Sequence, residues 1–216
     1  SLLVTGVQTC ALPIWYMNHK VESVQGLHDD AFALYNNAVR GTADYSADTL
    51  INNLNEGINT LKSCWKGKDA GVQIQNVITV YNALVNIRNV LGKLAADSSK
   101  IASNYREIQN ANGAGLSALS TITSEDKTIL PDYTDTADKV DITPEAEKGK
   151  AKIDAANDNI ANFIREVSKY FNNIMNNWTV GTGRDEAKTA FETFNSQSTQ
   201  YKETLSSVSR DRKSVV

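Results

Sequence analysis

Apolar side chains recur at intervals of three or four residues from Ile74 to Ile108, with one serine in the series. An α-helix turns once in 3.6 residues, so this spacing places the whole series on one helical face. The pattern predicts a long amphipathic helix over about residues 68–110, about 64 Å long at a rise of 1.5 Å per residue. Asn112 and Gly113, which tolerate left-handed backbone angles, are expected to end it.

Other segments have the same spacing. Residues 51–65 form one apolar stripe, and a weaker pattern indicates a helix near residues 27–39. Gly41 and Thr42 either end the helix between these segments or lie within one continuous helix over residues 27–64.

The C-terminal half contains two further periodic segments. The sequence Thr143-Pro144-Glu145 is typical of a helix start, and the stripe that follows extends to Trp178. Another stripe follows Gly181. Across the chain, the side chains expected on helix-packing faces are Ile51, Leu54, Ile58, Leu61, Val77, Tyr81, Leu84, Leu91, Ile160, Ile164, Val167, Phe171, Ile174, Phe194 and Tyr201.

Residues 111–143 differ in character from the periodic segments. They contain two glycines, a Ser/Thr cluster and four aspartates that recur at every third position from Asp132 to Asp141. A calcium-binding loop requires aspartates at alternate positions followed by glycine, and this segment has no such arrangement. We therefore expect a solvated acidic connector, with a short helix around residues 116–129 as an option.

The two halves of the chain resemble each other when Trp65 is aligned with Trp178. Apolar residues occupy the same positions 14, 11, 7 and 4 residues before each tryptophan, and glycine follows each tryptophan. Any two amphipathic helices share the stripe, so the shared tryptophan and glycine are the stronger indication of two related helical hairpins.

The sequence Trp65-Lys66-Gly67 lies between two amphipathic helices, as expected for the corner of a helical hairpin. A tryptophan in line with the apolar stripe can cover the seam where the helices meet. Gly67 can adopt a positive φ without steric cost, so the chain can reverse within two or three residues. We therefore predict that Trp65 and Gly67, and then Trp178 and Gly181, are the hairpin-turn residues.

Helices joined by Trp-x-Gly resemble the WXG100 family, whose members are small helical hairpins that bacteria export through type VII secretion systems. The resemblance covers residues 43–110 through Trp65-Lys66-Gly67 and, more loosely, residues 145–208, where the Trp178-to-Gly181 corner is one residue longer. Family members often pair as four-helix bundles. The resemblance thus implies tandem hairpins that pair with each other, and the type VII machinery or a cognate helical partner as the binding partner.

One family feature is missing from the C-terminal half. The family's export signal is Tyr-x-x-x-Asp/Glu after the last helix, whereas here Tyr170 and Tyr201 are followed four places later by Ile174 and Leu205. Either a partner supplies the signal or it lies beyond residue 210.

Composition argues against several classes of function. The net charge is −3 and there is no strong basic block, so the chain has no electrostatic footprint for nucleic acids. Two histidines and two cysteines leave little from which to build a metal site, an acid–base pair or a disulfide framework. We therefore expect no enzyme activity, no cofactor, no bound metal and no small-molecule substrate.

Both ends of the chain look foreign. Residues 1–14 and 211–216 resemble translations of sequencing adapters, and the apolar N-terminus lacks the basic start of a secretory signal peptide. The expected organisation is a first hairpin over residues 15–110, a connector over 111–143 and a second hairpin over 144–210.

The sequence therefore predicts an all-α protein of two tandem antiparallel helical hairpins, packed as an elongated bundle. We expect a non-enzymatic protein, secreted or associated with the bacterial cell envelope without a Sec signal peptide, that acts through protein–protein interaction. Two alternatives remain: an N-terminal targeting domain of a longer toxin or enzyme, and a structural helical bundle unrelated to type VII secretion.

Overall fold

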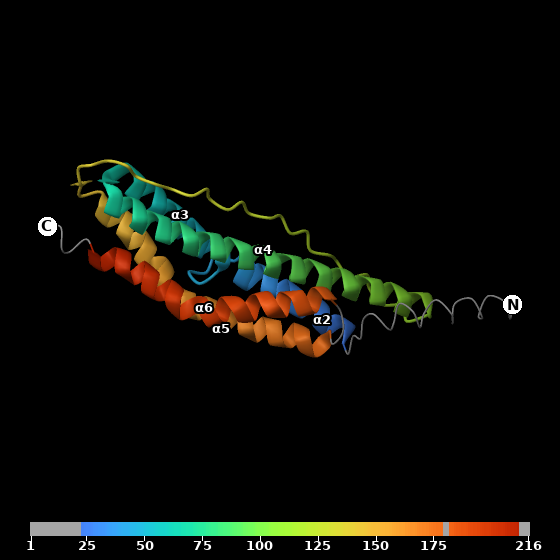
Figure 1. The fold of residues 1–216 in the computed structure, drawn as a ribbon. Coiled ribbons are helices and arrows are strands. Elements are labelled where there is room, and N and C mark those ends of the chain that lie inside the picture. The colour runs from blue at the N-terminus through green and yellow to red at the C-terminus, as the bar shows by residue number, and fades with distance from the viewer. Residues whose placement is uncertain (1–22, 179–181, 212–216) are drawn as a thin grey trace.

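The computed structural model describes residues 23–178 and 182–211. Gly181, segment 1–14 and residues 212–216 lie outside the described residues. In chain order the elements are α2 (Val24–Ala33), the π-helix η1 (Leu34–Val39), α3 (Ala47–Cys64), β1 (Trp65–Lys66), α4 (Lys68–Ala111), β2 (Asp141–Ile142), α5 (Ala146–Asn177) and α6 (Thr182–Asp211). These elements pack as an elongated bundle (Figure 1). The protein is all-α, as its periodicity predicts.

The helical structure is interrupted between η1 and α3. A Cβ atom at Gly41 would lie 2.5 Å from the carbonyl oxygen of Asn37, so the backbone leaves no room for a side chain there. The next helix begins with its own cap, because the Ser46 hydroxyl accepts a hydrogen bond from the Thr49 N–H at 3.3 Å. The alternative of one continuous helix over residues 27–64 is therefore wrong.

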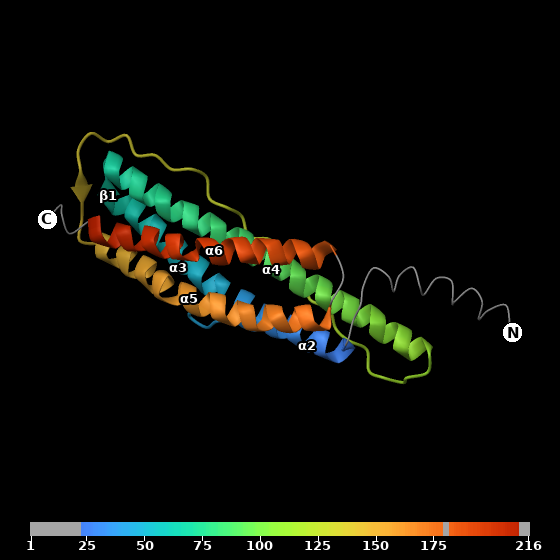
Figure 2. The same ribbon diagram turned by 60° about the horizontal axis from the view of Figure 1, so that its bottom comes forward.

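The two hairpins pack against each other within the chain. α3 contacts α5, α4 contacts α6, and α2 lies against both α4 and α5. The α3–α4 corner lies at one end of the bundle, and the α5–α6 corner lies toward the other end (Figure 2). All of the side chains expected on packing faces are buried except Ile164 and Tyr201, which are partly buried and pack against the core.

α3 and α5 approach each other closely at a pair of glycines. A Cβ atom at Gly57 would lie 2.7 Å from Cγ1 of Ile153 and 2.9 Å from the carbonyl oxygen of Gly149. A Cβ atom at Gly149 would in turn lie 3.1 Å from the carbonyl oxygen of Gly57. Both helices therefore need glycine at this crossing, a requirement that the apolar stripes do not reveal.

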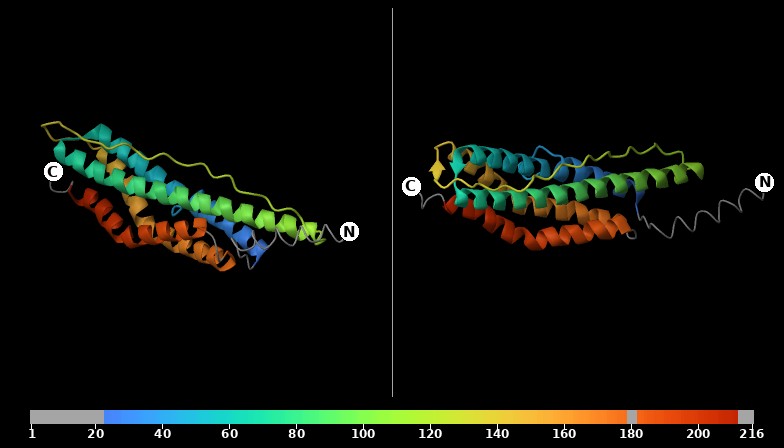
Figure 3. Two further views of the ribbon diagram at one scale, coloured as in Figure 1. Left: turned by 45° about the vertical axis from the view of Figure 1, so that its right-hand side comes forward. Right: turned by 45° about the horizontal axis from the view of Figure 1, so that its top comes forward.

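The connector is extended along most of its length and lies along α4 (Figure 3). No helix forms around residues 116–129, and α5 begins at Ala146, directly after the sequence predicted to start it. Although many of its side chains are exposed, the connector is more than a solvated acidic linker, because hydrogen bonds fasten its main chain to α4. The expectation of a simply solvated connector is corrected accordingly.

Amide side chains of α4 bind the connector's main chain. The Asn82 Oδ1 accepts from the Leu130 N–H at 2.8 Å, and its Nδ2 donates to the Leu130 carbonyl at 3.0 Å. Asn89 makes the same two bonds to Lys127, both at 2.8 Å. The Gln75 Oε1 accepts from the Tyr133 N–H at 2.7 Å. We call these three side chains, Gln75, Asn82 and Asn89, the amide ladder.

The ladder works because two repeats have nearly the same length. Its members are seven residues apart on α4, which is about 10.5 Å along a helix. Their partners Lys127, Leu130 and Tyr133 are three residues apart, which is about 9–10 Å along an extended chain with a three-residue repeat. The match lets one helix face bind three successive repeats of the connector.

Replacing both Asn82 and Asn89 by alanine is expected to release the connector while leaving the helices folded. Four side-chain–main-chain hydrogen bonds disappear, and cleavage of the connector by trypsin should become about ten-fold faster or more, since it requires local opening. Circular dichroism should show unchanged helix content. Asn86→Ala, an exposed asparagine of the same helix, is the matched control; equal cleavage of the two variants would contradict the fastening role.

Candidate functional site

The first candidate surface is the corner between α3 and α4. Trp65 directly follows α3 with extended backbone angles (φ −129°, ψ 117°), and its N–H donates to the Leu61 carbonyl. Only 4% of its surface is exposed. The side chain is therefore part of the core, at the end of the apolar stripe that predicts it.

Gly67 provides the reversal of direction. Its φ is +117°, in the left-handed region that side chains disfavour, and it directly precedes the first residue of α4. A Cβ atom there would also lie 3.4 Å from Val140 of the connector. The predicted positive φ is confirmed.

The end of the connector closes over this corner. Trp65 pairs with Ile142 and Lys66 with Asp141 in a two-residue antiparallel ladder, and the Thr143 N–H donates to the Cys64 carbonyl at 3.0 Å. This clip fixes the start of α5 beside the end of α3. Strands of two residues have no periodicity, so the sequence contained no signal for it.

The second corner repeats the local geometry of the first. Trp178 directly follows α5 with φ −121° and ψ 101°, and its N–H donates to the Ile174 carbonyl at 2.7 Å. Its exposed fraction is 2%. The two tryptophans thus share backbone conformation, the hydrogen bond to the carbonyl four residues earlier, and burial. Gly181, the predicted turn glycine, lies outside the described residues.

The surroundings of the two tryptophans differ. Trp178 lines a cavity of about 430 Å³ together with Asp97 and Ile101 of α4 and Gly183 of α6. The second corner therefore rests against the side of α4, whereas the first lies at the end of the bundle (Figure 2). The Nε atom of Arg184 donates to the Trp178 carbonyl at 2.9 Å and ties the start of α6 to this corner.

Desolvation by neighbouring atoms raises the pKa of Asp97 although the residue is exposed at the surface, and Lys100 and Lys93 partly oppose this effect. The folded chain therefore binds this proton more tightly than the unfolded chain, and the ionised carboxylate lowers stability above the folded-state pKa. Because Asp97 is exposed and its charge is screened by solvent, Asp97→Asn should raise the melting temperature at pH 7 by no more than about 1 °C, an advantage that disappears near pH 3. Thermal unfolding at both pH values measures this; a lower melting temperature at pH 7 would contradict it.

No family model, curated protein or solved structure matches this chain. The resemblance to the WXG100 family therefore depends on the two corners and on the hairpins that they join.

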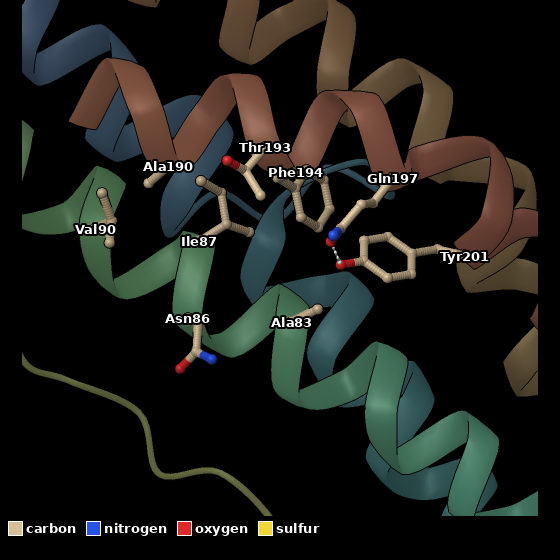
Figure 4. Close-up of a pocket in the computed structure, with 9 residues that line it drawn as sticks. All are labelled: Ala83, Asn86, Ile87, Val90, Ala190, Thr193, Phe194, Gln197 and Tyr201. Atoms are coloured by element: carbon tan, nitrogen blue, oxygen red, sulfur yellow. Dashed lines mark hydrogen bonds between the residues drawn. The ribbon is translucent and has the colours of Figure 1, made fainter. Parts of the chain in front are cut away.

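A second candidate surface is a shallow groove between α4 and α6 (Figure 4). It encloses about 280 Å³, and Ile87, Phe194 and Tyr201 contribute apolar surface to it. The Tyr201 hydroxyl donates to Oε1 of Gln197, one turn earlier on α6, and burial raises the pKa of the tyrosine. The sequence placed Phe194 and Tyr201 on a packing face, and the structure places them where α6 faces α4.

A third candidate is a polar cavity of about 410 Å³ beside the end of η1. The Nε atom of Arg88, whose exposed fraction is 4%, donates to Asp48 at 3.0 Å, and its Nη1 donates to the Glu125 carbonyl. Lys127 also approaches Asp48, at 3.6 Å. Arg88 and Lys127 share the Asp48 carboxylate, so the cluster fastens α3, α4 and the connector to one another. An arginine within the apolar stripe of residues 84–91 was the sequence signal for it.

No group of three or more His, Cys, Asp or Glu side chains within residues 23–178 and 182–211 could hold a metal ion. His28, one of the two histidines, contacts Asp29 at 3.0 Å, and Asp30 accepts hydrogen bonds from Asn173 and Asn177 of α5. None of the helices in these ranges is long and apolar enough to cross a membrane.

Proposed function

We propose that this chain is a non-enzymatic secreted helical protein of the type VII pathway, which acts by presenting a folded helical bundle to the export machinery or to a cognate helical partner. The proposal places it outside the bacterial cytoplasm or at the cell envelope, without a Sec signal peptide. The WXG100 resemblance suggests this role, and the geometry of the two corners supports it.

One observation carries the proposal. Trp65 and Trp178 end two separate helices with nearly the same backbone angles and the same N–H bond to the carbonyl four residues earlier. Both rings are buried, and each lies at the corner of a helical hairpin. A tryptophan corner that occurs twice in one chain is harder to attribute to chance than a single three-letter motif.

The packing of the hairpins supports an interaction role. α3 packs on α5 and α4 on α6, so each hairpin covers the apolar face of the other. The bundle's remaining surfaces are then available as recognition surfaces, including the shallow groove between α4 and α6.

An export experiment tests the proposal. The complete reading frame, expressed together with its neighbouring genes, is compared in a bacterium with an intact type VII system and in an isogenic strain that lacks the type VII ATPase. We expect the protein in the culture medium or cell envelope only when the ATPase is present, with a cytoplasmic marker retained in both strains.

Two outcomes would contradict the proposal. Equal distribution in both strains would favour the structural bundle unrelated to type VII secretion. Export of a reading frame that continues into a toxin or enzyme domain would favour the targeting-domain alternative.

A further inference from the structure

The polar cavity beside η1 lies where η1, α3, α4 and the connector meet. Its volume of about 410 Å³ falls within the range of small-molecule pockets, which is about 300–1,000 Å³. Three cationic side chains from different parts of the sequence line it: Arg40 directly after η1, Arg88 of α4 and Lys127 of the connector. The tertiary fold therefore gathers these charges, although the sequence contains no basic block.

Arg88 is the buried member of this group. Its Nε atom donates to Oδ1 of Asp48 at 3.0 Å, and its Nη1 atom donates to the Glu125 carbonyl. The remaining nitrogen, Nη2, has no hydrogen-bond partner among the residues that the structure describes. Two bonds thus hold the guanidinium in place, and Nη2 keeps its donors for an acceptor in the cavity.

The other two cations also lack a carboxylate of their own. Lys127 approaches Oδ1 of Asp48 at 3.6 Å, so a single carboxylate oxygen serves both Arg88 and Lys127. The side chain of Arg40 is exposed and forms no ion pair with any described residue. Positive charges that converge on a cavity raise the local concentration of anions.

Two acidic residues of the lining do not cancel this effect. Asp126 is paired with Lys93, which lies outside the lining, at 2.9 Å. Glu125 is exposed and meets Arg88 through its main-chain carbonyl. The site then holds four cationic side chains, Arg40, Arg88, Lys93 and Lys127, and three carboxylates, Asp48, Glu125 and Asp126. One positive charge remains in excess.

An unusual backbone element positions two of the lining residues. η1 is a π-helix, a rare form that is found frequently at functional sites. The Arg40 N–H donates to the Tyr35 carbonyl, five residues earlier, at 2.8 Å, and both side chains line the cavity. The Tyr35 hydroxyl donates to the Thr123 carbonyl at 3.0 Å and fastens the connector beside them. The π-turn therefore sets the position of Arg40 at the cavity.

We propose that this cavity is a binding site for a small oxyanion, held by the guanidinium of Arg40, Nη2 of Arg88 and the ammonium group of Lys127. Arginine and lysine donors bind phosphate and carboxylate oxygens through charge-assisted hydrogen bonds. A bound oxyanion would join α4 and the connector to the end of η1. The site goes beyond the secretion role proposed above and does not depend on it.

Isothermal titration calorimetry of the full chain with inorganic phosphate, at pH 7 and constant ionic strength, tests the proposal. We expect saturable binding with a Kd on the order of 1 mM or below. Arg40→Ala should bind about ten-fold more weakly, because a charge-assisted hydrogen bond is lost. Since Arg40 is exposed, this variant should keep the melting temperature of the wild-type chain when phosphate is absent.

Matched variants locate the binding in the cavity. Arg165 is an exposed arginine of α5 outside the lining, and Arg165→Ala should bind phosphate as the wild-type chain does. If Arg40→Ala loses stability, Lys127→Ala serves in its place, because the bonds of Lys127 to Asn89 involve only its main chain. Glu125→Gln removes a carboxylate from the lining and should tighten binding. A parallel titration with succinate shows whether the site prefers phosphate or carboxylate.

Three results would overturn the proposal. These are no saturable binding of phosphate or succinate by the folded wild-type chain, equal affinity of the wild-type chain and Arg40→Ala, and weaker binding by Glu125→Gln. The last result would show that a carboxylate helps to hold the ligand, which is contrary to an oxyanion site.

Discussion

Replacing Trp65 by alanine is expected to lower the free energy of unfolding by about 3–5 kcal/mol, because a large ring leaves a cavity where α3 meets α4. In a chain of this size each kcal/mol changes the melting temperature by about 2–4 °C, so the fall should exceed about 6 °C. Differential scanning calorimetry or circular dichroism measures it. The structural basis is the ring's 4% exposure at the end of the apolar stripe.

A matched control separates the effect of losing this corner from the general effect of shortening an apolar side chain. Val72, near the start of α4, is 59% exposed, and Val72→Ala should change the free energy of unfolding by no more than about 0.5 kcal/mol. If Trp65→Ala were as stable as the control, the tryptophan would not hold the corner, and the argument from two equivalent corners would lose its physical basis.

Replacing Gly57 by leucine is expected to destabilise the bundle by about 3 kcal/mol or more, at the upper end of what overpacked sites cost. A Cβ atom alone would lie 2.7 Å from Ile153 and 2.9 Å from the carbonyl oxygen of Gly149, and part of that obstacle is backbone. The two helices must therefore separate. Chemical denaturation of the variant and of the wild-type chain measures the loss.

Alanine substitutions make this second test more specific. Helix propensity favours Gly→Ala by about 1 kcal/mol, so Gly57→Ala loses stability only if the close crossing outweighs that gain. At Gly183 in α6 the nearest atoms to an added Cβ lie at 3.7 and 3.9 Å, which is ordinary contact. Gly183→Ala should therefore be neutral or stabilising, and a Gly57→Ala variant that behaves in the same way would contradict the close α3–α5 crossing.

Helical periodicity predicted most of the fold because each predicted stripe reports burial of one helical face. It placed the long helix at residues 68–110 where α4 spans Lys68–Ala111, and the turn chemistry at Gly67 predicted its positive φ. The break near Gly41 was left open, because a single glycine ends some helices and is tolerated within others, so the local sequence did not distinguish the two alternatives.

The face of α4 under the connector could not be predicted from the apolar stripe. It consists of buried glycines and partly buried amides, residues that ordinarily indicate a solvated surface. A seven-residue repeat of amide side chains at Gln75, Asn82 and Asn89 was present in the sequence, and it becomes meaningful only when paired with a three-residue repeat in the connector. The two-residue clip at Trp65 is set by tertiary contacts alone.

The arrangement of the helices has a mechanical consequence. α2 begins at one end of the bundle and α6 finishes at the other, so tension applied between them acts along the helix axes (Figure 1). Because α2 and α6 both lie against α4 and α5, stretching the protein requires whole helices to slide past their neighbours, with many side-chain contacts broken together. The bundle should therefore resist elongation far better than it would resist being peeled open from one side.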